Sequence, residues 1–277
     1  MAQAKRKEAE EVAPAAAAVD FTPDAGQWQR PQAISRRGLA VLIGAVVFFN
    51  LPMLHYYLFR SQQPATASLP FSDDFSDQKH ITDNYFSTGG LWRIEDGWLL
   101  SPGVKNNPLW LKADLPQNVS IEFDVKSMSP EGDIKVEIFG DGTDHASGYV
   151  LIHGGWNNSL SIIARLDEHG RSLQSLLQES QQVAARDHLS SSGVVETGVF
   201  KANTRMRVEA SPYPVQIGKV YHWRIERRGS VIQWFIDGNE FMRFDDPFPL
   251  VGKGHNRMGF SSWEAQLYFD NLKIQAL

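Results

Sequence analysis

The amino-acid sequence predicts an antiparallel β-sandwich that contains one inserted helix and follows a single N-terminal transmembrane helix. Three observations support this fold class. Residues 38–59 contain no Asp, Glu, Lys or Arg, segments after Pro70 alternate apolar and polar residues, and Asp-Gly pairs occur at 96–97, 141–142 and 237–238. Alternation with a period of two is typical of a sheet with one buried face, and Asp-Gly is a preferred hairpin turn.

The apolar run at residues 38–59 is long enough to cross a bilayer as a helix. At about 1.5 Å per residue it reaches roughly 33 Å, and the hydrocarbon core is about 30 Å thick. A low-complexity tail at 1–37 precedes it, and a short linker at 60–69 follows. The Arg36-Arg37 pair also resembles a twin-arginine export signal. However, the apolar run exceeds the roughly 7–15 residues of a signal peptide, which favours an uncleaved anchor.

The charge distribution predicts the orientation of this anchor. Residues 1–60 carry seven basic and five acidic side chains, whereas residues 61–277 carry 20 basic and 27 acidic ones. Because basic flanks stay in the cytoplasm, we expect a single-pass protein of the cell (inner) membrane, with its N-terminus cytoplasmic and its C-terminal domain periplasmic or extracellular. An acidic exported domain is not expected to bind nucleic acid.

Residues 70–277 are expected to form the sandwich. Strict alternation predicts strands at Ile121–Lys126, Ile134–Ile138 and Tyr221–Glu226, and residues 231–236 and 240–244 predict a hairpin around Asp237-Gly238. A period of two also places charged side chains on a face that we expect to be solvated. These side chains are Glu122, Asp124, Lys126, Lys135 and Glu137.

One segment departs from the strand pattern. Residues 171–189 place Leu173, Leu176 and Leu177 at helical spacing, which predicts an inserted helix. Such a helix either caps one end of the sandwich or docks another protein, and the sequence favours the cap.

The chain contains no cysteine, which excludes disulfide bonds, Cys-ligated metal centres and thiol nucleophiles. It also has no phosphate-binding glycine loop and no nucleophile-elbow motif. We therefore expect no cofactor. A domain of about 200 residues has enough core to be stable without disulfides.

Several short motifs resemble those of concanavalin A-like and laminin-G-like jelly rolls, most closely the 3-keto-disaccharide hydrolase domain family. The resemblance spans roughly residues 70–277, with the predicted helix as a departure. It implies a jelly-roll sandwich, and for function it implies glycan processing. The matching segments are Asp73-Asp74-Phe75, residues 92–99, 121–125, 222–226 and 232–238, Asp245-Asp246, Met258-Gly259-Phe260 and residues 267–274.

Two pairs of carboxylates are candidates for chemistry. Glu122 and Asp124 share one face of a strand and resemble part of the Glu-x-Asp-x-x-Glu pattern of family 16 glycoside hydrolases, but Ser127 stands where the second glutamate is required. Asp141 and Asp144 are candidate metal ligands, although two carboxylates fall short of the six to eight oxygens that Ca²⁺ takes. We therefore expect no catalytic residue and no metal.

A glycine-rich and amide-rich loop around Trp156 suggests a carbohydrate site. Sugars stack their apolar faces on aromatic rings and form hydrogen bonds with amides. The candidate ligand-binding residues are His153, Trp156, Asn157, Trp263 and Glu264. The alternative is a tight hairpin in which Trp156 covers the edge of the core.

These features favour a non-catalytic structural or binding subunit. The sandwich would contact partner proteins in a membrane-embedded complex, for example a respiratory or photosynthetic one, or in an envelope complex. The alternatives are a glycan-processing enzyme similar to 3-keto-disaccharide hydrolases and a carbohydrate-binding module. The expected partners are the lipid bilayer, other proteins and a glycan.

Overall fold

The computed structural model describes residues 34–59, 63–186 and 199–277. The chain divides into two units, residues 1–60 and residues 61–277. Most of the predicted tail and part of the predicted linker therefore lie outside the described residues.

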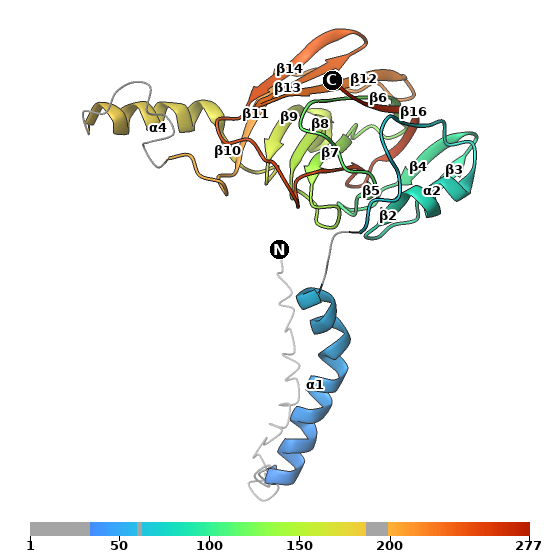
Figure 1. The fold of residues 1–277 in the computed structure, drawn as a ribbon, viewed down its shortest axis with the longest axis vertical. Coiled ribbons are helices and arrows are strands. Elements are labelled where there is room, and N and C mark those ends of the chain that lie inside the picture. The colour runs from blue at the N-terminus through green and yellow to red at the C-terminus, as the bar shows by residue number, and fades with distance from the viewer. Residues whose placement is uncertain (1–33, 60–62, 187–198) are drawn as a thin grey trace, which may run out of the picture. The chain divides into compact units, whose positions relative to one another are not determined.

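Helix α1 spans Arg36–Phe59 and begins two residues before the apolar run (Figure 1). It begins there because the Gly38 amide donates to Ser35 Oγ at 3.0 Å, which caps the first turn. The helix continues through Pro52, and its large apolar side chains from Leu39 to Leu54 are exposed, with Phe49 78% accessible. Among the described residues, α1 is the one helix long and apolar enough to cross a membrane.

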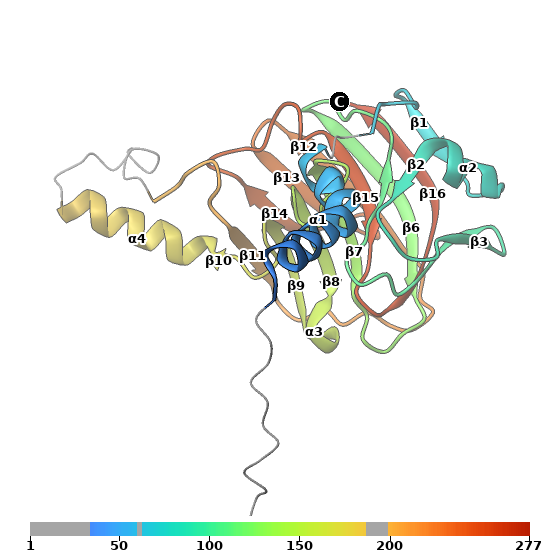
Figure 2. The same ribbon diagram turned by 90° about the horizontal axis from the view of Figure 1, so that it is seen from below.

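The second unit is a sandwich of two sheets, which confirms the predicted all-β jelly-roll class (Figures 1 and 2). The first sheet has the order β14-β13-β12-β6-β16-β4-β3, with β1 paired to β16. Its strands are β1 (Phe71–Asp73), β3 (Arg93–Glu95), β4 (Trp98–Pro102), β6 (Val119–Ser127), β12 (Tyr221–Arg228), β13 (Val231–Ile236), β14 (Asn239–Asp245) and β16 (Gln266–Ala276).

The second sheet has the order β10-β11-β9-β8-β7-β15-β5-β2. All of its pairs are antiparallel except β10 with β11. Its strands are β2 (Tyr85–Ser87), β5 (Leu109–Leu111), β7 (Ile134–Gly140), β8 (Tyr149–Gly154), β9 (Leu160–Arg165), β10 (Arg171–Ser172), β11 (Met206–Ala210) and β15 (Arg257–Ser261).

The main core lies between the two sheets. Ile121, Phe123 and Val125 of β6 are fully buried, as their alternation predicts. The Phe123 ring lies 5.4 Å from that of Phe260 on the second sheet and 5.4 Å from that of Trp223 on its own sheet. Aromatic contacts across the sandwich therefore join its two layers.

Two of the three predicted Asp-Gly pairs form two-residue hairpin turns, and the third, Asp141-Gly142, begins the longer loop between β7 and β8. Asp96-Gly97 joins β3 to β4 and Asp237-Gly238 joins β13 to β14, and all four residues have positive φ, as a type I′ turn requires. Asn239 belongs to β14 and not to the turn, because it pairs with Ile236.

Helix α4 spans Leu173–Arg186, within the predicted helical segment. It extends from the sheet edge beside β10 and β11 in both views (Figures 1 and 2). The predicted start at Arg171 is two residues early because Arg171 and Ser172 pair with β11 as strand β10. Residues 187–189 of the prediction lie outside the described residues. Helix α2 (Gln78–Asn84) was not predicted, and Asp77 caps it by accepting from the Lys79 amide.

The outer face of the second sheet is covered and not solvated. Val150, Ile152, Ile162 and Ala164 form a small apolar cluster on that face, and Ala146 of the β7–β8 loop packs against it. The expectation of a solvated face is therefore wrong for β7, where Lys135 is 2% and Glu137 0% exposed.

Candidate functional site

A pocket of about 510 Å³ lies on the outer face of the second sheet, at the end where β7 begins and β8 ends. Lys135 of β7 and Ile152 of β8 belong to its sheet wall. Loops supply the remaining lining, including Asn106, Asp133, Trp156, Glu168 and Trp263. The loop that follows β8 lies at this end of the sandwich, where Figure 2 labels it α3.

The pocket contains four of the five residues predicted to bind carbohydrate, namely Trp156, Asn157, Trp263 and Glu264. The two tryptophans come from different loops and are 39% and 48% exposed. Large aromatic side chains that remain half exposed at a pocket can offer their faces to a ligand.

His153, the fifth predicted residue, does not line the pocket. Successive residues of a strand point to opposite faces, so Ile152 faces the pocket while His153 faces the main core. The His153 ring stacks on Tyr213 at 5.2 Å, and its Nε2 donates to the Tyr213 carbonyl at 2.7 Å. Burial lowers the pKa of His153 to about 4.

Trp156 lies in an unusual backbone segment. Residues Gly155–Asn158, labelled α3, form a left-handed turn, with φ of 50° at Trp156, 58° at Asn157 and 61° at Asn158. The left-handed conformation costs a non-glycine residue roughly 1–2 kcal/mol, less for asparagine than for tryptophan. The predicted alternative was a tight hairpin with Trp156 over the core edge. The hairpin is present, because β8 and β9 are antiparallel neighbours and Gly155 pairs with Leu160, but Trp156 is 39% exposed and its ring lies beside His169 and Arg207.

Two contacts hold the left-handed turn in place. The Asn158 side chain accepts from the Val215 amide at 2.7 Å and donates to the Val215 carbonyl at 2.8 Å. Gly132 lies against the same residue, because a Cβ there would be 2.7 Å from Asn158 Oδ1. These contacts fix the position of Trp156, since the segment cannot relax without breaking them.

Lys135 is the centre of a charged network at the pocket wall. Its Nζ donates to Asn106 Oδ1 at 2.9 Å and to Glu168 Oε2 at 3.2 Å, and it lies 3.9 Å from Asp133 Oδ1. Asp133 Oδ2 accepts from the Trp263 amide at 2.7 Å. Burial raises the pKa of Asp133, and the charge of Lys135 offsets only part of this effect. Glu131 also lines this pocket, and its side chain is exposed.

A second buried group lies beside this network. Glu137 Oε1 contacts His145 Nδ1 at 2.6 Å, and Glu137 Oε2 accepts from the Ala146 amide at 2.8 Å. Burial lowers the pKa of His145, but the hydrogen bond and charge of Glu137 outweigh it, so the net shift is upward. Glu137 therefore holds the β7–β8 loop over the outer face of the sheet.

The structure does not bring the predicted carboxylate pair to this pocket. Glu122 and Asp124 lie on the outer face of the first sheet, on the opposite side of the sandwich. His222 Nδ1 contacts Asp124 Oδ1 at 2.8 Å, and its Nε2 lies 3.9 Å from Glu122 Oε2. The Asn271 amide also donates to Asp124 at 2.9 Å.

Asp141 has the role of a turn residue. Its Oδ1 accepts from the amides of Thr143 and Asp144, both at 2.7 Å, and from Ser147 Oγ at 3.1 Å. This oxygen is fully used within its own loop, which is what Asp-Gly turn chemistry predicts.

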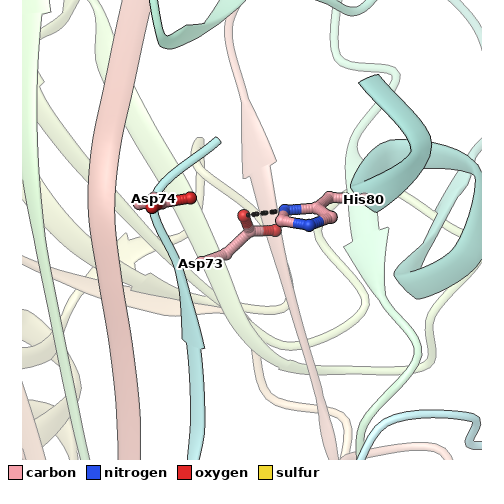
Figure 3. A group of neighbouring side chains, drawn as sticks. All are labelled: Asp73, Asp74 and His80. Atoms are coloured by element: carbon pink, nitrogen blue, oxygen red, sulfur yellow. Dashed lines mark hydrogen bonds and ion pairs between the residues drawn. The ribbon is translucent and has the colours of Figure 1, made fainter. Parts of the chain in front are cut away.

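Among the described residues, the group with the spacing of metal ligands is Asp73, Asp74 and His80, whose ligand atoms lie within 4.8 Å of one another. Figure 3 shows His80 of α2 facing Asp73 at the end of β1. The distance between His80 Nδ1 and Asp73 Oδ1 is 2.7 Å. Asp73 Oδ1 also accepts from the Phe75 amide at 2.9 Å, and its Oδ2 accepts from Tyr85 at 3.1 Å. These contacts satisfy a buried structural carboxylate, and Asp74 beside it is exposed.

Six polar or charged residues that line the pocket were not predicted as site residues from the sequence. They are Asn106, Glu131, Asp133, Lys135, Glu168 and His169. They come from separate loops and one strand, and only the fold brings them together. The one sequence signal for this site was Lys135, a charged residue between the apolar residues Ile134 and Val136 of a predicted strand. Strand alternation led to the interpretation that Lys135 is solvated.

No protein-family model matches the chain, and no curated protein matches it. Solved structures share its general architecture at low identity. A carbohydrate-binding module, CBM66, from Bacillus subtilis matches with 13% identity and a TM-score of 0.48, covering 70% of this chain and 96% of that one.

Two further structures show similar values. A sialidase matches with 13% identity and a TM-score of 0.49, covering 78% of this chain but 19% of the sialidase. A Bacillus subtilis protein of unknown function with a galectin-like fold matches with 11% identity and a TM-score of 0.43, covering 74% and 94%. All three TM-scores are below 0.5. The resemblance to 3-keto-disaccharide hydrolases stays a prediction.

Proposed function

We propose that the sandwich binds a saccharide in this pocket and that the chain is a membrane-anchored glycan-binding protein. The supporting observation is that Trp156 and Trp263, both half exposed, share one pocket with two asparagines and several carboxylates. Saccharides present apolar ring faces and many hydroxyl groups, so this combination of aromatic faces and hydrogen-bonding groups suits them. Helix α1 would anchor the domain, with the sandwich outside the cytoplasm.

A glycan array tests this proposal. The full chain, in micelles of a mild detergent, is applied to immobilised oligosaccharides beside a variant that carries Trp156→Ala and Trp263→Ala. The wild type is expected to retain a defined set of glycans that the double variant loses. Leu91→Ala is the matched control, because Leu91 is 79% exposed and does not line the pocket. The proposal is wrong if no glycan is retained above empty micelles, or if the double variant retains the same set.

Glycan processing is the second candidate function, and one observation favours it. Asp133 and Glu168 lie in the pocket, 3.9 Å and 3.2 Å from the Lys135 ammonium, and burial raises the pKa of Asp133, as expected for a general acid. Mass spectrometry of each retained glycan after incubation distinguishes the two functions. Cleavage that Asp133→Asn abolishes supports an enzyme, and intact glycan supports binding alone.

The prediction of a subunit that contacts partner proteins stays a prediction. Among the described residues, no contact or surface favours it over glycan binding.

A further inference from the structure

The pocket carries an excess of negative charge. Four carboxylates line it, from Glu131, Asp133, Glu168 and Glu264, and Lys135 is the one lysine or arginine in its lining. Carboxylates that lie in a partly enclosed pocket are screened less than those on an open surface. The pocket therefore presents a field that attracts cations and repels anions.

The nearby cations are already engaged within the protein. Lys135 is 2% exposed and donates to Asn106 and Glu168, so it does not present its charge to a ligand. Lys105 lies 3.8 Å from Glu264, but this pair is about two-thirds exposed and contributes little. Arg207 lies 5.7 Å from the centre of the Trp156 ring and donates to the Glu168 carbonyl.

The carboxylates of Glu131 and Asp133, in contrast, can still form an ion pair with an added cation. Within the described part of the chain, Glu131 makes no hydrogen bond or ion pair. Asp133 Oδ1 lies 3.9 Å from Lys135 Nζ, beyond hydrogen-bond distance, and the buried carboxyl has a raised pKa. An additional positive charge in the pocket would stabilise its ionised form.

A buried polar group on the same face also lacks a partner. Ser261 pairs with Lys135 in the ladder between β15 and β7, so both side chains lie on the outer face of the second sheet. Ser261 is 0% exposed, and its Oγ has no hydrogen-bond partner in the described structure. Ser261 does not line the pocket, so this unpaired hydroxyl lies beside Lys135 and not on the binding surface.

We infer that the pocket selects saccharides that carry free amino groups, such as oligomers of glucosamine, over N-acetylated and acidic saccharides. The ammonium groups would pair with Glu131, Glu264 and Asp133, while the sugar rings contact Trp156 and Trp263. Uronates and sialylated or sulfated sugars would meet four carboxylates, whereas the one lysine or arginine in the lining, Lys135, is already engaged with Asn106 and Glu168. This inference rests on the proposed function and names the class of ligand.

Isothermal titration calorimetry with three ligands of equal length tests the inference. The full chain in detergent is titrated with trisaccharides of glucosamine, of N-acetylglucosamine and of galacturonate. The experiment is run near pH 6, where primary amines are protonated and carboxylates with an ordinary pKa of about 4.3 are ionised. We expect the glucosamine trisaccharide to bind at least fivefold more tightly than its N-acetylated counterpart, and the galacturonate trisaccharide to bind most weakly.

Charge variants show whether this preference arises in the pocket. Glu131→Gln with Glu264→Gln is expected to reduce the preference for glucosamine to below twofold. Glu122→Gln with Asp124→Asn removes the same formal charge from the opposite face of the sandwich and is expected to leave the preference unchanged. Added salt should weaken glucosamine binding more than N-acetylglucosamine binding.

The outcomes separate the inference from the proposed function. If the glucosamine and N-acetylglucosamine trisaccharides bind equally well and Trp156→Ala weakens both, the charge selectivity is wrong, but the proposal of glycan binding still holds. A preference for galacturonate would also overturn the charge selectivity. If none of the three ligands binds and the array is empty, both proposals fail. An equal loss of preference in both charge variants would show that the overall charge of the protein, and not the pocket, causes it.

Discussion

Replacing Trp156 with alanine is expected to weaken saccharide binding about eightfold. A tryptophan side chain offers up to about 250 Å² of surface, and Trp156 is 39% exposed, which leaves about 100 Å² for a ligand. If a sugar ring covers about half of that area, about 25 cal/mol per Å² gives about 1.2 kcal/mol, or about eightfold in Kd. Complete coverage sets an upper limit of about 2.5 kcal/mol on the same basis.

The assay is calorimetric titration of the full chain with the glucosamine and N-acetylglucosamine trisaccharides. Alanine at position 156 leaves in place the two hydrogen bonds between the Asn158 side chain and Val215, which hold the left-handed turn. The loss should therefore appear in affinity and not in the unfolding midpoint. A change below twofold in Kd for both ligands, or an equal change in Leu91→Ala, would refute the assignment of Trp156 to the binding surface.

Three further predictions concern the left-handed turn and two buried or partly buried ion pairs elsewhere in the sandwich. Asn158→Ala removes two hydrogen bonds that hold the left-handed turn, so the free energy of unfolding should fall by about 1–3 kcal/mol and saccharide affinity should fall with it, as urea unfolding and calorimetry can measure. Arg165→Met leaves the buried Asp246 carboxylate without the guanidinium at 2.9 Å, so unfolding in urea should show a loss of about 3–5 kcal/mol. The hydrogen bond to Asp73 raises the pKa of His80, so its stabilising contribution is present below the unfolded pKa of about 6.5 and is lost as the pH rises through the higher folded value. Thermal unfolding from pH 5 to pH 8 should show that His80→Gln lacks this loss. If Asn158→Ala lowers the free energy of unfolding more than Arg165→Met does, the ranking of the two contacts is wrong. If His80→Gln has the same pH profile as the wild type, the ion pair between His80 and Asp73 does not stabilise the fold.

Much of the fold could be predicted because its local and global signals agree. The alternation of Ile121, Phe123 and Val125 with charged residues specifies β6 and its buried face. Asp237-Gly238 specifies a two-residue turn, because both positions need positive φ. These signals depend on neighbouring residues only, which is why the sequence is sufficient to detect them.

The covered face of the second sheet could not be predicted in the same way. Lys135 and Glu137 alternate with apolar residues just as Glu122 and Asp124 do, yet the first pair is buried and the second is partly exposed. The difference arises from the β7–β8 loop and from distant partners such as Glu168, which supply the opposite charges that burial requires. Strand periodicity contains no information about what lies over a face.

The candidate site was predicted in part for a similar reason. Trp156, Asn157, Trp263 and Glu264 were accessible to prediction, because aromatic and amide residues beside glycines on loops are typical of saccharide sites. His153 was included because of its proximity in sequence, although the alternation of β8 turns it into the core. Asp133 and Glu168 were missed because 35 positions separate them and only the packing of two loops brings both to Lys135.

Nuclear magnetic resonance of the tryptophan indole groups tests the central claim most directly. The chain has eight tryptophans, whose indole N–H signals can be assigned by substitution and followed while the full chain in detergent is titrated with the glucosamine trisaccharide. Saccharide binding in the pocket predicts saturable shifts of the Trp156 and Trp263 signals, with the fully buried Trp223 and Trp234 signals unchanged. Saturable binding that leaves the signals of Trp156 and Trp263 in place would contradict the account, because the ligand would then occupy another surface.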